Sequence, residues 1–136
     1  MAAVLVDAGP LVALVDRTDR HHAEWVAALK RLKAPLLSAW PPLTEAMYLL
    51  SAWDRAQDAL WTLVESGAIG IAELTRADVP RLSALMQQYR DQPMDLADAA
   101  LVRIAEREGV RKIFTLDRRH FTVYRIGERS RFTVVP

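Results

Sequence analysis

Short apolar runs alternate with stretches of helical periodicity along this chain. Five apolar runs predict strands at residues 4–6, 35–39, 69–74, 112–116 and 132–135. Apolar positions three and four residues apart predict helices at 11–15, 21–32, 44–51, 54–65, after Thr75, and at 97–107. Strands that alternate with helices pair in parallel through right-handed crossovers. We therefore predict an α/β fold, a three-layer α/β/α sandwich with a central parallel sheet.

Residue types at the helix ends support this division. Thr75 and Asp78 have the spacing of a capping box, and Gly109 follows helix 97–107 where a left-handed turn would end it. Pro41 and Pro42 precede helix 44–51, which places Glu45 in its first turn. Trp61 is expected to face the core from helix 54–65.

Composition narrows the class of protein. The 136 residues are 51% hydrophobic and 26% charged, as in a globular chain, and their number suits one domain, 1–136. There is no Cys, which excludes disulfides and thiolate metal sites. No apolar run approaches the ~20 residues of a membrane span. The apolar opening lacks a basic region and Asp7 interrupts it, so a first strand is expected rather than a signal peptide, in a cytoplasmic protein.

Two acids follow predicted strands. Asp7 comes after strand 4–6, and Asp117 comes after strand 112–116. The carboxyl ends of parallel strands are where open α/β sheets bind their ligands. The alternative for each acid is a turn residue that bonds its own backbone. The strand-end position favours a functional role.

Three more acids lie at predicted helix starts. Glu45 is the only charged residue between Pro35 and Trp53. A favourable helix dipole, worth ~0.3–1 kcal/mol, would explain its sign but not its isolation. Asp95 and Asp98 are three residues apart on one helix face. Capping explains Asp95 well, whereas Asp98 directly precedes a buried run and is favoured as a functional residue.

Carboxylates gathered in one place repel one another and raise one another's pKa unless a cation is present. Hard oxygen ligands suit Mg²⁺ or Mn²⁺, and such an ion activates water and stabilises charge on a phosphate. The sequence therefore predicts a divalent metal site. His120 lies beside Arg119 and Phe121 and could contact substrate, but we interpret it as a surface residue.

Charge is unevenly distributed although the net charge is only +1. Residues 1–102 carry nine basic and thirteen acidic side chains, whereas residues 103–136 carry nine and four. One interpretation is two solvated faces. The other is an acidic site beside a basic surface that binds a phosphate-bearing polymer. Arg118 and Arg119 directly follow Asp117, so we expect them at the rim of the site as substrate-binding residues.

Four segments, LVDAGPLVAL, LTEAMYLL, MDLADAALVRIAE and TLDRRHF, resemble PIN domains in the order and spacing of their acids. The resemblance extends along nearly the whole chain. It implies a parallel sheet between helices and a ribonuclease that depends on Mg²⁺ or Mn²⁺. Small members of the family are often the toxins of VapBC-type toxin–antitoxin pairs, so RNA and a small antitoxin are the implied partners.

The same resemblance places the catalytic, metal-binding acids at Asp7, Glu45, Asp98 and Asp117, with Asp95 as an accessory metal ligand. Two positions depart from the family pattern. Ala8 and Gly9 follow the first acid, where relatives often have Ser or Thr. His120 precedes Phe121, where relatives often have Asp.

Two other functions remain open from the sequence. One is a PIN-like nucleic-acid-binding module without catalysis, which a metal-binding titration would distinguish. The other is a small Mg²⁺-dependent phosphatase, which would need a Lys beside its acids. The chain has three lysines, Lys30, Lys33 and Lys112, and none ends a late strand.

The aromatic content predicts a homodimer. The chain has four tryptophans, Trp25, Trp40, Trp53 and Trp61. Helices 44–51 and 54–65 are apolar on more than one side, and such helices need burial all round. Twofold pairing is the commonest way to provide it.

Overall fold

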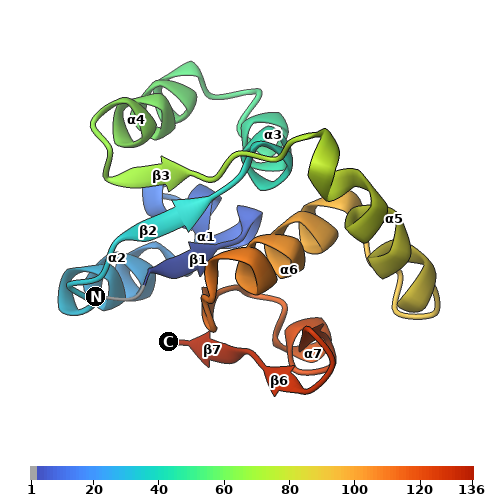
Figure 1. Ribbon diagram of the computed structural model, residues 1–136. Helices are drawn as coiled ribbons and strands as arrows, with labels where there is room; N and C mark the ends of the chain where they lie inside the picture. Colours follow the sequence, from blue (N-terminus) through green and yellow to red (C-terminus); the bar gives the residue numbers. More distant parts are fainter. Residues whose placement is uncertain (1–2) are drawn as a thin grey trace.

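The computed structural model describes residues 3–136 and shows a five-stranded sheet between two layers of helices (Figure 1). The strands are β1 (Val4–Val6), β2 (Leu36–Ser38), β3 (Ile69–Ile71), β4 (Lys112–Phe114) and β7 (Thr133–Val135). Their order is β3-β2-β1-β4-β7, and every neighbouring pair is parallel. Met1 and Ala2, part of the expected domain 1–136 and of its apolar opening, lie outside the described residues.

Six longer helices cover the two faces of the sheet. On one face lie α1 (Ala8–Val15), α2 (His22–Arg31), α3 (Trp40–Leu49) and α4 (Asp54–Glu65). On the other lie α5 (Val79–Gln88) and α6 (Leu96–Glu108). The three-layer α/β/α prediction is therefore confirmed.

The first apolar run, residues 4–6, forms β1, the central strand of the sheet. All three of its residues are fully buried. Val4 and Val6 pack into the cluster formed with α1 to α4, while Leu5 packs into the cluster formed with α6. Leu5 pairs with Leu37 of β2 on one side and Ile113 of β4 on the other. A strand buried on both faces is continuously apolar, as the sequence shows.

Hydrogen bonds and ion pairs at Asp78 connect the start of α5 to α6 on the second face of the sheet. Thr75 and Asp78 form the predicted capping box, although it begins a short 3₁₀ turn, η1 (Arg76–Asp78), ahead of α5. Asp78 is also nearly completely buried, and it accepts hydrogen bonds from Arg103 and Arg107 of α6. Gly109 ends α6 with a φ of 68°, which confirms the left-handed stop.

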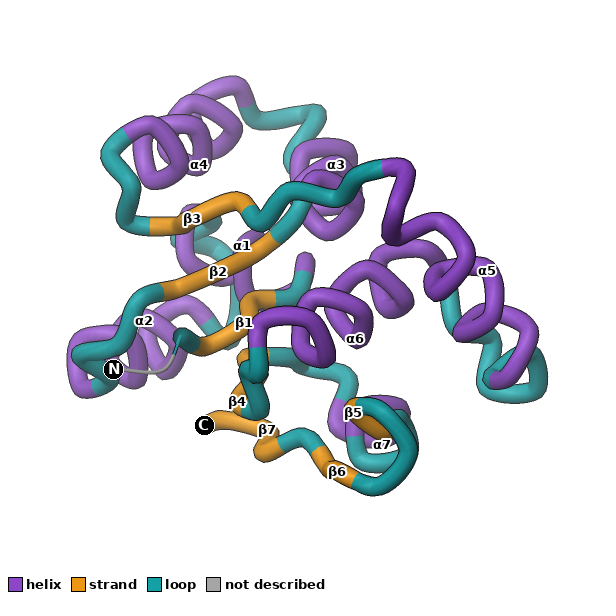
Figure 2. The backbone as a smooth tube through the Cα atoms, viewed as in Figure 1, coloured by secondary structure: helices purple, strands orange, loops and turns teal. Residues whose placement is uncertain are grey.

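The C-terminal part holds elements that the periodicity did not predict. They are the four-residue helix α7 (Arg118–Phe121) and an antiparallel ribbon of β5 (Arg125–Ile126) and β6 (Ser130–Arg131). Figure 2 shows these short pieces together beside β7, joined by turns. Elements of two to four residues are too short to show a period.

Several predicted boundaries and one orientation were wrong. Helix α1 starts at Ala8 rather than residue 11, and α3 starts at Trp40 rather than residue 44. The prolines lie inside the first turns of these helices, where the missing N–H of proline costs no hydrogen bond. They are Pro10 in α1, and Pro41 and Pro42 in α3. All predicted strands except the first are shorter in the structure. Trp61 is 41% exposed instead of facing the core.

None of the helices formed by residues 3–136 combines the length and apolar character needed to cross a lipid bilayer.

Candidate active site

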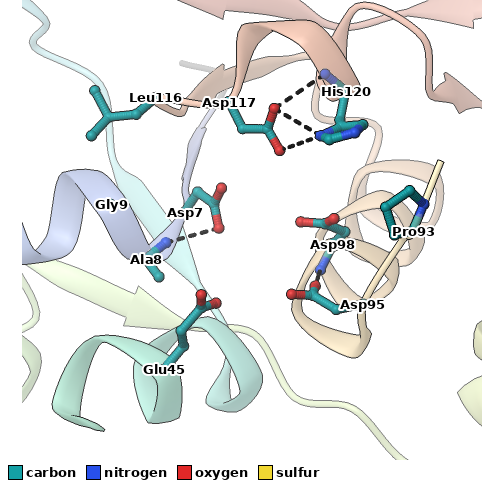
Figure 3. A pocket seen from close by; sticks show the side chains of 10 residues that line it. All are labelled: Asp7, Ala8, Gly9, Glu45, Pro93, Asp95, Asp98, Leu116, Asp117 and His120. Atoms are coloured by element: carbon teal, nitrogen blue, oxygen red, sulfur yellow. Dashed lines mark hydrogen bonds and ion pairs between the residues drawn. The ribbon is translucent and has the colours of Figure 1, made fainter. Parts of the chain in front are cut away.

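The five predicted acids line one open pocket of about 440 Å³ at the carboxyl edge of the sheet (Figure 3). Its lining residues are Asp7, Ala8, Gly9, Glu45, Pro93, Asp95, Asp98, Leu116, Asp117 and His120. The acids come from the ends of β1 and β4, from α3, and from the start of α6. The structure thus brings together residues that are up to 110 positions apart in sequence.

Asp7 both caps α1 and faces the pocket. Its Oδ1 accepts a hydrogen bond from the Ala8 N–H at 2.8 Å, and its Oδ2 accepts one from the Thr115 hydroxyl at 2.9 Å. Burial raises the pKa of Asp7, the two hydrogen bonds oppose this, and the charges of Asp95 and Asp117 add to the rise. Asp7 therefore has the turn role considered from the sequence, and it also lies in the acidic pocket.

Glu45 lies on the second turn of α3 because that helix begins at Trp40. The helix dipole acts mainly within the first turn, so it does not account for this acid. Glu45 is exposed and lines the pocket. Partial desolvation of its carboxyl group, followed by the charges of Asp95 and Asp7, raises its pKa. The expected first-turn position was wrong, but the acid does face the other carboxylates.

Asp95 and Asp98 make different contacts at the start of α6. Asp95 is the N-cap, and its Oδ1 accepts a hydrogen bond from the Asp98 N–H at 2.8 Å. Asp98 is half-buried, and its Oδ2 accepts a hydrogen bond from the Tyr124 hydroxyl at 3.0 Å. Burial, with the charges of Asp95 and Asp7, raises the pKa of Asp98 to about 7, and the Tyr124 hydrogen bond opposes that rise.

Asp117 caps the unpredicted helix α7. Its Oδ1 accepts a hydrogen bond from the His120 N–H at 3.2 Å, and both carboxylate oxygens lie within 2.9 Å of His120 Nδ1. His120 is half-buried and lines the pocket, so its interpretation as a surface residue was wrong.

Thr115 is a site residue that sequence reasoning missed. Its hydroxyl donates to Asp7 and accepts the N–H of Asp117, so one buried side chain joins two of the acids. A signal was available, because Thr115 lies two residues before the strand-end acid, in a position to bond the turn that follows.

Among residues 3–136, those that line the acidic pocket do not include Arg118 or Arg119. Arg118 donates a hydrogen bond to the Pro136 carbonyl and lines a separate cavity of about 220 Å³. Leu116 lines both cavities. Arg119 is exposed. A substrate-binding role for either arginine would therefore concern parts of a substrate that extend beyond the pocket.

The donor set fits a hard divalent cation by its chemistry. Five carboxylates supply oxygen ligands, and the pKa values of Asp7, Glu45 and Asp98 are raised partly by neighbouring acids, which is repulsion that a cation relieves. Within residues 3–136, no three His, Asp or Glu side chains are arranged so that they could hold a metal ion together. Binding a cation would therefore require these side chains to rotate toward one another.

Comparisons with known proteins agree with this architecture. Residues 4–126 match the family model described as PIN domain. Over 135 residues the chain is 31% identical to Ribonuclease VapC26 of Mycobacterium tuberculosis (strain ATCC 25618 / H37Rv), a match covering 98% of this chain and 100% of that protein. The crystal structure of Mycobacterium tuberculosis VapC20, described as a sarcin-ricin loop cleaving toxin, superposes with a TM-score of 0.71. It is 18% identical, and the match covers 81% of this chain and 86% of that chain, so it bears on the fold alone.

Proposed function

Because this chain belongs to the PIN-domain family, we propose that it is a divalent-metal-dependent endoribonuclease that hydrolyses phosphodiester bonds in RNA. The observation that carries the proposal is the single pocket lined by five carboxylates at the carboxyl edge of the sheet. A ribonuclease that matches over nearly the full length of both chains supports the choice of RNA.

In this proposal Asp7, Glu45, Asp98 and Asp117 hold Mg²⁺ or Mn²⁺, and Asp95 assists them. The bound ion would supply positive charge for the reacting phosphate and lower the pKa of water. Thr115 fixes Asp7 and Asp117 relative to each other through its two hydrogen bonds. His120 holds Asp117 through Nδ1, and its ring lines the wall of the pocket. These contacts restrict how far Asp7 and Asp117 can move when the other carboxylates rotate toward a bound ion.

A cleavage assay tests the function directly. Purified protein is incubated with single-stranded and hairpin RNAs in Mg²⁺, Mn²⁺ or EDTA, and the products are sized on gels. A hairpin of the sarcin-ricin loop belongs in the set because the structural neighbour is described as cleaving it. Cleavage with metal and none in EDTA is expected. RNA binding without any cleavage would favour the non-catalytic binding module, and release of phosphate from small esters would favour the phosphatase.

The phosphatase alternative lacks the lysine that it would need beside the acids. Of the residues that the structure describes, no lysine lines the acidic pocket. Lys112 begins β4 at the opposite edge of the sheet from Asp117, which follows that strand's end. The nuclease proposal therefore accounts for more of the pocket than the phosphatase does.

Arg118→Ala together with Arg119→Ala is expected to weaken RNA binding and to reduce the slope of log affinity against log salt by about one to two units. Both side chains are exposed just after Asp117, in the C-terminal segment 103–136 that carries excess positive charge. Each phosphate contact releases counterions, so losing contacts flattens the salt dependence. Filter-binding titrations over a salt series measure this slope.

A matched control removes two charges elsewhere. Lys30 and Lys33 are exposed at the end of α2, ahead of β2 and so at the amino edge of the sheet. Lys30→Ala with Lys33→Ala should leave the slope nearly unchanged, and Mn²⁺ affinity should be little altered in either double variant. Equal slopes for the wild type and the Arg118/Arg119 variant would mean that these arginines do not contact phosphate.

We also propose that the protein is a homodimer. Trp25 is 3% exposed and packs on Phe114, so it belongs to the core and does not support the predicted interface. Trp40, Tyr48 and Leu49 of α3, by contrast, are 53%, 76% and 50% exposed. With Leu96 of α6, Trp40 and Tyr48 line an open apolar groove of about 620 Å³. A second copy would cover this surface.

Tyr48→Asp is expected to convert a dimer into a monomer at tens of micromolar, because a charge would be buried at the pairing surface. Light scattering gives the mass, and circular dichroism verifies the fold. Trp61→Asp on α4 is the matched control and should leave the dimer intact. A wild-type protein with the monomer mass would contradict the proposal, and loss of the dimer only in the Trp61 variant would move the interface to α4.

The toxin role and its antitoxin form the last part of the proposal. A small DNA-binding protein encoded immediately upstream would support it. Co-expression of that neighbour should then restore growth to cells in which this enzyme is toxic. If toxicity persists when the neighbouring protein is co-expressed, that protein is not an antitoxin for this ribonuclease.

A further inference from the structure

Tyr124 lies in the segment between α7 and β5, and its side chain is fully buried. Its ring packs edge-on against Tyr89 and Phe121, with centroids 5.0 and 5.1 Å away. It also lies nearly parallel to the ring of His120, at 6.1 Å and 15°. Three aromatic neighbours in different directions leave the ring little freedom to move. The hydroxyl is therefore held at a defined point beside the acidic pocket.

That hydroxyl donates a hydrogen bond to Asp98 Oδ2 at 3.0 Å. Within the described residues it is the only hydrogen bond recorded for the side chain of Asp98, whose backbone N–H is already engaged by the Asp95 cap. Of the two groups in this contact, the phenol carries the proton at neutral pH, so Tyr124 is the donor and the carboxylate of Asp98 is the acceptor. A donor fixed by packing is well suited to orient a carboxylate that is otherwise free to rotate.

We infer that Tyr124 is a positioning residue for Asp98, holding Oδ2 so that Oδ1 stays available to a divalent cation in the pocket. This inference rests on the metal-binding part of the proposed function. The outer partners of metal ligands restrict ligand orientation, and losing one typically costs 10- to 100-fold in metal affinity or activity. None of the sequence motifs includes Tyr124, which is 26 residues from Asp98.

Tyr124→Phe removes one oxygen and keeps the ring in its cluster. Tyr89→Phe is the matched control, because the Tyr89 hydroxyl belongs to the same cluster but accepts a hydrogen bond from the Arg125 N–H instead of contacting an acid. Mn²⁺ binding to each protein is measured by calorimetry, at a temperature where melting curves show every variant folded. We expect Tyr124→Phe to weaken Mn²⁺ binding about 10- to 100-fold and Tyr89→Phe to change it less than about twofold.

Cleavage kinetics separate positioning from a general structural effect. In Tyr124→Phe the Mn²⁺ concentration for half-maximal cleavage should rise by the same factor as the dissociation constant. The rate at saturating Mn²⁺ should recover to within a few-fold of wild type, because the ligand itself is still present.

Each other outcome has a definite meaning. Unchanged Mn²⁺ affinity in folded Tyr124→Phe overturns the inference, and so does an equal loss in Tyr89→Phe, which would indicate loosened packing. Failure of the wild type to bind Mn²⁺ would overturn both the inference and the metal dependence. Normal Mn²⁺ binding with the expected Tyr124→Phe loss, but no RNA cleavage, would overturn the proposed nuclease activity while the inference stands.

Discussion

Asp98→Asn is expected to lower RNA cleavage in Mg²⁺ or Mn²⁺ by at least about a hundredfold while the protein stays folded. Asn keeps the shape of the side chain and can still accept the Tyr124 hydrogen bond, but it lacks the charge that holds a cation. Half-buried beside Asp95 and Asp7, the ionised carboxylate of Asp98 is disfavoured in the metal-free protein. Its removal should therefore leave the melting temperature at neutral pH unchanged or higher.

Asp95→Asn provides the comparison on the same helix turn. Asn caps helices about as well as Asp, so the start of α6 should stay intact. Cleavage should fall less than in Asp98→Asn, because Asp95 serves chiefly as the cap. Single-turnover rates and circular dichroism are measured for both variants. A larger loss at Asp95 would mean that the two roles are reversed, and near wild-type cleavage by folded Asp98→Asn would remove that acid from the mechanism.

Sequence patterns predicted the layers of the fold because burial dictates them directly. Residues 4–6 must be apolar on both sides to lie in the centre of a parallel sheet, and their pattern shows this without any homologue. Helix starts were less well predicted. Proline was treated as a barrier ahead of a helix, whereas Pro41 and Pro42 lie within the first turn of α3.

Positions of the five acids were predictable for a related reason. An acid just after a strand or at a helix start is placed by local geometry, so Asp7, Asp95, Asp98 and Asp117 reach one sheet edge once the topology is known. Glu45 reached the pocket for a different reason than the one first considered, since it lies on the second turn of α3.

The supporting residues depend on tertiary contacts that no local pattern encodes. Thr115 bonds an acid 108 residues away, and Tyr124 reaches Asp98 from beyond α7. Adjacency to Asp117 also misled the placement of Arg118 near the acids. Successive residues on a helix point about 100° apart, so a side chain next to a site residue is directed elsewhere. Arg118 accordingly turns to the Pro136 carbonyl.

Mn²⁺ affinity is expected to fall by about tenfold for each pH unit below 7. The pKa of Asp98 is raised to about 7, so at lower pH a proton must leave before this carboxylate can act as a ligand. The pKa values of Asp7 and Glu45 are raised as well, so protons on these two acids would compete with the ion in the same sense. Calorimetry from pH 5 to 8 in buffers of different ionisation enthalpy measures both the affinity and the protons released.

The raised pKa of Asp98 also makes the stability of the metal-free protein depend on pH, and this dependence is opposite in sign to that of the Mn²⁺ affinity. Between the ordinary Asp pKa of 3.8 and about 7, the folded state binds more protons at Asp98 than the unfolded state does. Its contribution to the free energy of unfolding therefore declines as pH rises through this window and levels off above it. Asp98→Asn should flatten this part of the stability curve, as followed by urea unfolding. A wild-type protein whose Mn²⁺ affinity is constant from pH 5 to 8 would show that Asp98 is not a metal ligand with a raised pKa.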